Sequence, residues 1–150
     1  MSFFDGYDIT TSGMSAQRTR INVVSSNIAN AQTTHTIDGG PYKKQNVNFQ
    51  EVLMGLKGDE KFDAAKDDIN LLSLRGVGVK EIIESKDEPM MKFEPNHPDA
   101  NKDGYVAYPN INPVIEMVDL VEAMRSYEAN VSAFKTQKDL DTKTLEILKA

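Results

Sequence analysis

The side chains whose spacing most resembles a chemical site lie between Asp99 and Gly104. Asp99, Asn101 and Asp103 place side-chain oxygens at alternate positions, and Gly104 follows them. This is the first half of an EF-hand calcium loop, which needs oxygen ligands at positions 1, 3 and 5 and glycine at position 6. The twelfth position, where such a loop has a bidentate Glu, is Asn110. The competing interpretation is an Asx-rich turn at Gly104 leading into a short strand, because Asp and Asn bond their own backbone.

The flanks of this loop favour the turn. Pro95 and Pro98 preclude the regular helix that should precede an EF-hand loop. A calcium-binding module is therefore only the alternative interpretation. The two histidines, His35 and His97, lie far apart in loop-like sequence. Glu94 and His97 stand three residues apart, but the prolines deny them the helix that this spacing requires. We expect no metal site at the histidines.

No other spacing indicates catalysis or a cofactor. The chain has no cysteine, so it has no thiol nucleophile, disulfide or Cys-ligated zinc. Gly76-Val77-Gly78 lacks the six-residue fingerprint of a dinucleotide loop, and no Gly-Lys-Ser/Thr phosphate loop occurs. Acidic residues are numerous, yet none are spaced as a catalytic pair. We therefore predict no catalytic residue, no metal, no cofactor and no enzymatic activity.

Composition excludes further classes. The 150 residues include 17 Lys and Arg against 23 Asp and Glu, a net charge of -6. This balance argues against nucleic-acid binding, since no basic cluster exceeds a pair. No apolar run reaches the ~18–20 residues that cross a bilayer. The first residues, MSFFDGYDITTSGM, lack the basic start and apolar segment of a secretory signal peptide. We expect one domain, or one small domain with long extensions.

Residues 1–31 predict an amphipathic helix over about residues 4–31. Their polar positions are mostly Ser and Asn, which form isolated helices poorly, so this helix should need a packing partner. Apolar side chains recur at heptad positions: Tyr7, Met14, Ile21 and Ile28 on one row, and Phe3, Val24 and Ala31 on its companion.

Residues 32–112 predict a small, mostly β unit with long loops. Asp38-Gly39-Gly40-Pro41 is a strong turn signal. Alternating or β-branched apolar residues then mark the expected strands: one around Val47 and Phe49, a second over residues 77–83, and a short third over residues 105–108. We expect a loop over residues 55–68.

Residues 113–150 predict the clearest helix, over about residues 113–148 and roughly 50–55 Å long. Pro113 suits a first helical turn, Asn112 is a candidate N-cap, and Glu116 lies near the positive end of the helix dipole. The apolar stripe is spaced by threes and fours: Met117, Leu120, Val121, Met124, Tyr127, Val131 and Phe134.

The predicted fold class is α+β, with long N- and C-terminal helices forming a coiled-coil-like pair and a small, mostly-β insert between them. The predicted divisions are an N-terminal assembly helix (1–31), a β-rich insert with long loops (32–112) and a C-terminal assembly helix (113–150). The sequence offers no third helix to complete a bundle. The heptad-like faces must therefore meet each other, other copies or a related protein.

Three groups of residues resemble the flagellar axial proteins, the family of rod and hook subunits. The matching segments cover roughly half of the chain. They are Gly13–Gln17 with Arg20–Ala31, then Asp38–Tyr42, and then His97–Ala100, Gly104–Val106, Pro109–Asn112, Glu116–Ala123 and Arg125–Val131.

This resemblance implies a structural subunit of the proximal rod in the bacterial flagellar basal body. Such a subunit would polymerise through its terminal helices into the drive shaft that transmits torque across the periplasm. The implied partners are copies of itself, other rod proteins, and basal-body ring and export components. Neither nucleic acid nor a small-molecule substrate is implied. Delivery would use the flagellar type III export system without a cleaved signal peptide.

With this resemblance, the heptad rows predict the assembly interface. We expect the N-terminal row to face the C-terminal stripe and neighbouring subunits. A soluble coiled-coil adaptor or export chaperone is the alternative function. The predicted interface residues are Tyr7, Met14, Ile21, Val24, Ile28, Met117, Val121, Met124, Tyr127, Val131 and Phe134.

Overall fold

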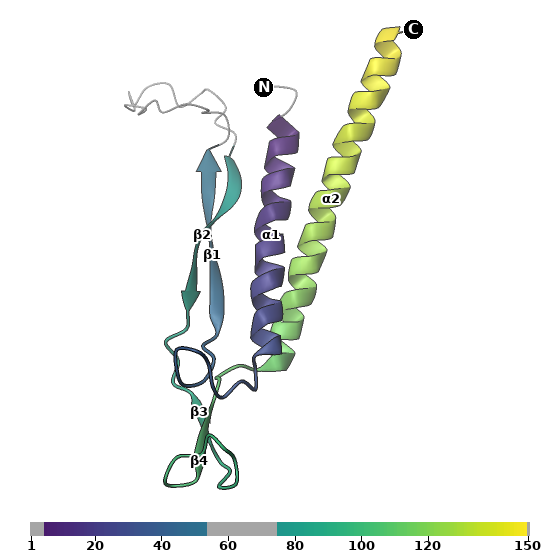
Figure 1. Ribbon diagram of the computed structural model, residues 1–150. Helices are drawn as coiled ribbons and strands as arrows, with labels where there is room; N and C mark the ends of the chain where they lie inside the picture. The colour runs from purple at the N-terminus through teal and green to yellow at the C-terminus, as the bar shows by residue number, and fades with distance from the viewer. Residues whose placement is uncertain (1–4, 54–74, 150) are drawn as a thin grey trace, which may run out of the picture.

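Two long helices lie side by side, with two small antiparallel sheets between them in sequence (Figure 1). The computed structural model describes residues 5–53 and 75–149, so the loop expected over residues 55–68 lies outside the described residues. The predicted α+β class is confirmed, whereas the division into three segments stays a prediction. The elements are α1 (Asp5–Ala29), β1 (Gln45–Leu53), β2 (Arg75–Glu84), β3 (Met90–Phe93), β4 (Tyr105–Tyr108) and α2 (Pro113–Lys149).

The two helices pair antiparallel along a heptad seam. At one end, Asn27 Nδ2 of α1 donates to Glu116 Oε2 of α2 over 3.0 Å. Gly13, two heptads earlier on α1, lies against Asn130, which is two heptads later on α2. Ala123, midway between them on α2, is fully buried. Each step of seven along α1 is thus matched by a step of seven back along α2, as antiparallel helices with a shared 3.5-residue period require.

The β1–β2 hairpin packs against α1, which places α1 between the hairpin and α2 (Figure 1). The strands pair from Gln45 opposite Glu84 to Leu53 opposite Arg75, with an irregularity after Asn48. Both strands occur where the alternating pattern predicted them. The backbone N–H of Val77 donates to Ser12 Oγ of α1 over 3.1 Å. The hairpin is therefore held on α1 by a hydrogen bond to a helix side chain in addition to packing.

The second sheet, β3–β4, projects beyond the ends of the helices that lie near it (Figure 1). The prediction of β4 is confirmed, but β3 was not predicted, because Met90-Met91-Lys92-Phe93 shows no alternation. The Phe93 and Tyr105 rings meet edge to face with centroids 5.3 Å apart. Val106 is fully buried and anchors this sheet.

The Asp99–Gly104 loop is the predicted Asx turn. Asn101 Oδ1 accepts hydrogen bonds from the backbone N–H groups of Asp103 and Tyr105, each 2.9 Å long. Gly104 has φ +81°, a left-handed conformation that favours glycine. The loop is tied to the segment after α1 by Thr34 Oγ1, which donates to Asp99 Oδ2 over 2.7 Å.

The predicted N-cap of the C-terminal helix is confirmed. Asn112 Oδ1 accepts from the backbone N–H of Val114 over 3.0 Å, which satisfies one of the amides that a helix start leaves without a partner. From there α2 runs for 37 residues, and its C-terminal turns extend well beyond the first turn of the 25-residue α1 (Figure 1). Neither described helix combines the length and hydropathy of a membrane span.

Candidate assembly surface

The structure places the eleven predicted interface residues in three environments. Val24 is buried. Met117, Val121 and Met124 remain 53%, 49% and 47% exposed. The others are half-buried beside the helix seam: Tyr7, Met14, Ile21, Ile28, Tyr127, Val131 and Phe134.

Met117, Val121 and Met124, which were expected to face the N-terminal helix and neighbouring subunits, lie about half exposed, and their place in the interface stays a prediction. The residues of α2 that are buried are Glu116, which is 1% exposed, and Ala123, which is 0% exposed. Small and polar side chains meet between the helices at two places, Gly13 against Asn130 and Asn27 against Glu116. The exposed part of the apolar stripe, Met117, Val121 and Met124, therefore lies beside the seam.

The heptad row of α1, which includes Met14, and the apolar stripe of α2, which includes Met124, nevertheless lie on one side of the helix pair. Met14 follows the seam residue Gly13, and Met124 follows the seam residue Ala123, each about 100° further around its helix. On antiparallel right-handed helices, positions that follow the seam point to the same side. Ser12, which precedes the seam, contacts the hairpin instead. We name the combined surface the apolar face: Tyr7, Met14, Ile21, Ile28, Met117, Met124 and Val131, with Val121 at its edge because it lies four residues after Met117 and three before Met124.

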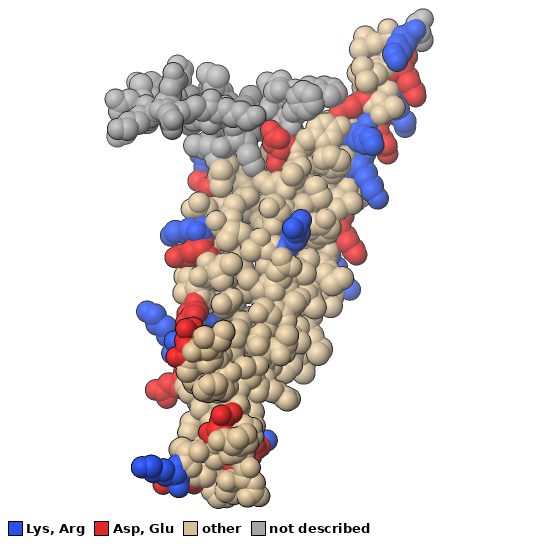
Figure 2. Space-filling view, in the orientation of Figure 1, with Lys and Arg blue, Asp and Glu red and all other residues tan. Residues whose placement is uncertain are grey.

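Charged side chains are sparse over the middle of the helix pair in the view of Figure 2. They gather along the outer edge of the hairpin and on the last turns of α2. Arg20 lies 3.7 Å from Asp119 and 3.9 Å from Glu122 across the helix pair. These pairs are partly exposed and contribute at most about 1 kcal/mol each. A contiguous apolar surface of this kind, exposed on a helix pair, is typical of a site that binds another protein.

The far end of the helix pair is held by Tyr7. Its ring meets that of Phe134 edge to face, with centroids 4.9 Å apart. Its hydroxyl donates to Asp141 Oδ2 over 2.5 Å. This hydrogen bond to a carboxylate is the main reason why the pKa of Tyr7 is raised to about 12. Tyr7 and Phe134, both predicted from the heptads, are thus brought together.

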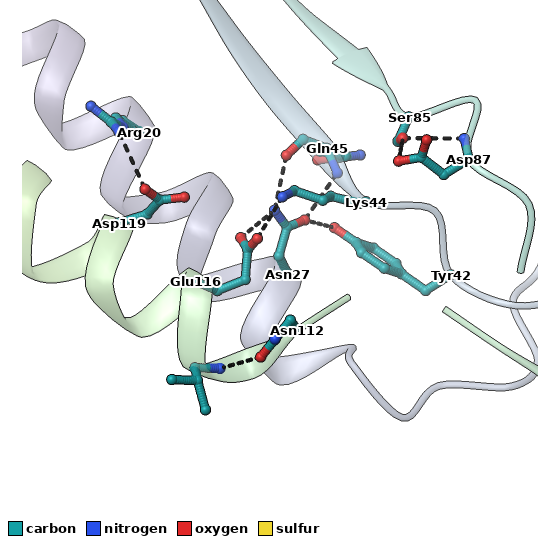
Figure 3. Close-up of polar contacts among 11 residues, drawn as sticks. Arg20, Asn27, Tyr42, Lys44, Gln45, Ser85, Asp87, Asn112, Glu116 and Asp119 are labelled. Carbon is teal, nitrogen blue, oxygen red and sulfur yellow. Dashed lines mark hydrogen bonds and ion pairs between the residues drawn. The ribbon is translucent and has the colours of Figure 1, made fainter. Parts of the chain in front are cut away.

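A buried polar cluster at the other end was not predicted (Figure 3). Asn27 and Glu116 meet there with Tyr42, Lys44 and Gln45, from the segment that enters β1. The sequence suggested only that Asn27 covers a polar helix face and that Glu116 complements the helix dipole. Nothing in their local spacing indicates that they touch, since 89 positions separate them.

Among residues 5–53 and 75–149, no three His, Asp or Glu side chains are grouped as metal ligands. The distinguishing feature is instead a pair of terminal helices that leaves an apolar face uncovered. This is the architecture of a subunit that packs against others.

Comparison with known sequences identifies the class. Residues 8–34 match the family described as flagella basal body rod protein, and residues 102–147 match the flagellar basal body rod FlgEFG protein C-terminal family. These segments hold most of α1 and α2.

Full-length relatives agree. The chain is 39% identical to the flagellar basal-body rod protein FlgC of Bacillus subtilis, over 98% of this chain and 99% of the relative. It is 38% identical to FlgC of Borreliella burgdorferi, over 99% of both chains, and 37% identical to FlgC of Salmonella typhimurium, over 98% of both. The chain belongs to the FlgC family of flagellar basal-body rod proteins. Its function is that of a structural rod subunit in the basal body, and the adaptor or chaperone alternative is not favoured.

Proposed function

We propose that this rod subunit polymerises through its terminal helices, with the apolar face as its contact with neighbouring copies and other rod proteins. The observation that carries the proposal is the half-exposure of Met117, Val121 and Met124 beside a matching row on α1. Several contiguous apolar side chains left in water favour burial by association, at ~25 cal/mol per Å² removed from water.

The proposed rod is a drive shaft that transmits torque without catalysis. Torque would pass through many buried subunit contacts, so no single residue needs to react. The absence of a predicted nucleophile or acid–base pair is compatible with this role. A chain that holds its neighbours by packing requires rigidity along the helix pair. The aromatic contact at Tyr7 and the seam around Gly13 supply it.

The export route and the ring contacts are also proposals. We propose delivery by the flagellar type III system without cleavage of a leader, and contact with basal-body ring and export components. On this proposal α1, which packs along α2, is retained in the assembled protein. The mass of the protein from isolated basal bodies should include all of α1. A mature N-terminus beyond Asp5 would contradict this route.

The assembly proposal is tested by Val121→Asp in cells that lack the native protein. The side chain is 49% exposed in the free subunit, so the purified variant should keep its fold and thermal transition. In an interface, the same carboxylate would be buried without a partner, at a cost of several kcal/mol. We expect no rods and no motility.

Val121→Ala is the matched control, because it shortens the side chain without adding charge, and it should support motility. Should Val121→Asp disturb the free subunit, Met124→Asp applies the same test on the same face. Motile cells with normal rods carrying either folded Asp variant would overturn the assignment of the apolar face.

A further inference from the structure

Glu116 is buried where both helices meet the start of the hairpin (Figure 3). Its Oε2 accepts a hydrogen bond from Asn27 Nδ2 of α1 over 3.0 Å. Its Oε1 lies 2.7 Å from Lys44 Nζ and receives no aligned hydrogen bond from the described residues. Lys44 belongs to neither helix; it directly precedes β1. The charge of this buried carboxylate is therefore balanced from the insert.

Asn27 joins the same three segments through its amide group. Nδ2 donates to the backbone oxygen of Gln45 over 2.9 Å as well as to Glu116. Oδ1 accepts from the backbone N–H of Gln45 over 3.0 Å and from the Tyr42 hydroxyl over 3.1 Å. Both donors and both acceptor positions of the amide are used. Asn27 thus pairs with Gln45 as a neighbouring strand would, while it holds Glu116 on its other side.

These contacts make pairing of the two helices at this end depend on docking of residues 42–45. If α1 and α2 paired at this end before residues 42–45 docked, the Glu116 carboxylate would be buried with the Asn27 amide as a hydrogen-bond donor but without the Lys44 ammonium to balance its charge. A buried charge without its partner strongly opposes burial. Docking of Lys44 removes that penalty, and Asn27 aligns the backbone of Gln45 beside it.

We propose that Asn27, Glu116 and Lys44 form a latch that couples pairing of the terminal helices to docking of the β1–β2 hairpin. The helix ends and the start of β1 then open and close as one unit, and Lys44 is the positioning residue that makes them do so. The latch lies within one subunit, so this inference stands apart from the proposed assembly surface.

The test is amide hydrogen exchange on the purified full chain, comparing Lys44→Met with Lys43→Met. Lys43 Nζ lies 3.5 Å from Glu84, and both side chains are more than half exposed, so that pair contributes little. Lys43→Met should leave exchange unchanged. Lys44→Met should accelerate exchange at least about tenfold in three segments together: the end of α1, the start of α2 and the start of β1.

A rescue separates coupling from simple loss of packing. Removing the carboxylate charge as well, in Lys44→Met with Glu116→Gln, should restore protection at the helix ends, because no unpaired charge is then buried. The start of β1 should remain faster than in the native chain.

Any one of three results would overturn the latch. The first is faster exchange at the start of β1 in Lys44→Met while both helix ends keep their native protection. The second is an equal effect of Lys43→Met and Lys44→Met, and the third is fast exchange at the helix ends that persists after Glu116→Gln is added. If Lys44→Met alone fails to fold, the comparison of the double variant with Lys43→Met still decides.

Discussion

Asn130 of α2 occupies the space that a side chain on Gly13 of α1 would need. A Cβ at Gly13 would lie 2.8 Å from Asn130 Oδ1 and 3.0 Å from its Cγ. Asn130 is itself held by a hydrogen bond from Nδ2 to the backbone oxygen of Ser126. Gly13 costs helix propensity, but it sets how closely the two helices approach.

Gly13→Ala should therefore destabilise the subunit by about 1–2 kcal/mol, because the clash with Asn130 outweighs the gain in helix propensity. Urea unfolding measures the change. Gly6→Ala is the control, since its Cβ would lie at an ordinary 3.5 Å from Gln137, and it should be neutral or slightly stabilising. A stabilised Gly13→Ala variant would contradict the close seam.

Tyr7 should ionise only well above the ordinary tyrosine range. Its folded pKa of about 12 exceeds the model-compound value of 10.0, chiefly because of its hydrogen bond to Asp141. The stabilising contribution is thus fully present below about pH 10 and is lost as the pH rises through about 12. Ultraviolet titration of the native chain minus that of Tyr7→Phe isolates this group.

Asp141→Ala should return the Tyr7 titration toward its ordinary range. Asp139→Ala is the matched control, because Asp139 is the weakest of the causes that raise this pKa, and it should change the curve little. Equal effects of the two substitutions would show that general negative charge, and not the Tyr7–Asp141 hydrogen bond, raises the pKa.

Asn112→Ala should lower the free energy of unfolding by about 1 kcal/mol, since it removes the cap on the Val114 amide. Asn112→Asp keeps a capping oxygen and should retain most of the stability. Thermal unfolding of both variants measures the difference. Equal losses in the two would mean that the capping bond contributes nothing.

Calcium should give no saturable heat with the purified chain. Asn101 Oδ1 already accepts two backbone amides, so it would have to give up the turn to bind a cation. Isothermal calorimetry with calcium makes this check. A saturable heat that disappears in Asp103→Ala would revive the EF-hand interpretation of residues 99–104.

The sequence predicts elements better than it predicts which helix residues touch. The row of Tyr7 and Met14 stood out because large apolar side chains dominate any periodic pattern. The actual seam runs one residue away, through Gly13 and Ala123, since close helix contact selects small side chains. Of the large side chains in these rows, Tyr7 and Phe134 do meet across the helix pair, whereas the small residues Gly13 and Ala123 gave no signal in the pattern; the apolar face as a surface stays a prediction.

The latch was beyond prediction for a different reason. Asn27, Lys44 and Glu116 come from three segments, and each has an ordinary local explanation as a polar helix residue, a surface lysine or a first-turn acid. Only the path of the chain brings them together, so no spacing rule finds them. The strand β3 was not predicted because its four residues show no alternation of polar and apolar side chains. It is defined by its pairing with β4, which the sequence does not reveal.

The central claim is that the apolar face becomes buried in the rod. Because the chain has no cysteine, a single thiol introduced as Met124→Cys can report on that face in a strain that still swims. In the purified subunit this thiol should react readily with a maleimide, as the 47% exposure of Met124 predicts. In isolated basal bodies it should be protected, and it should react again after the rod is dissociated. Equal labelling in the free subunit and in the intact basal body would contradict the account.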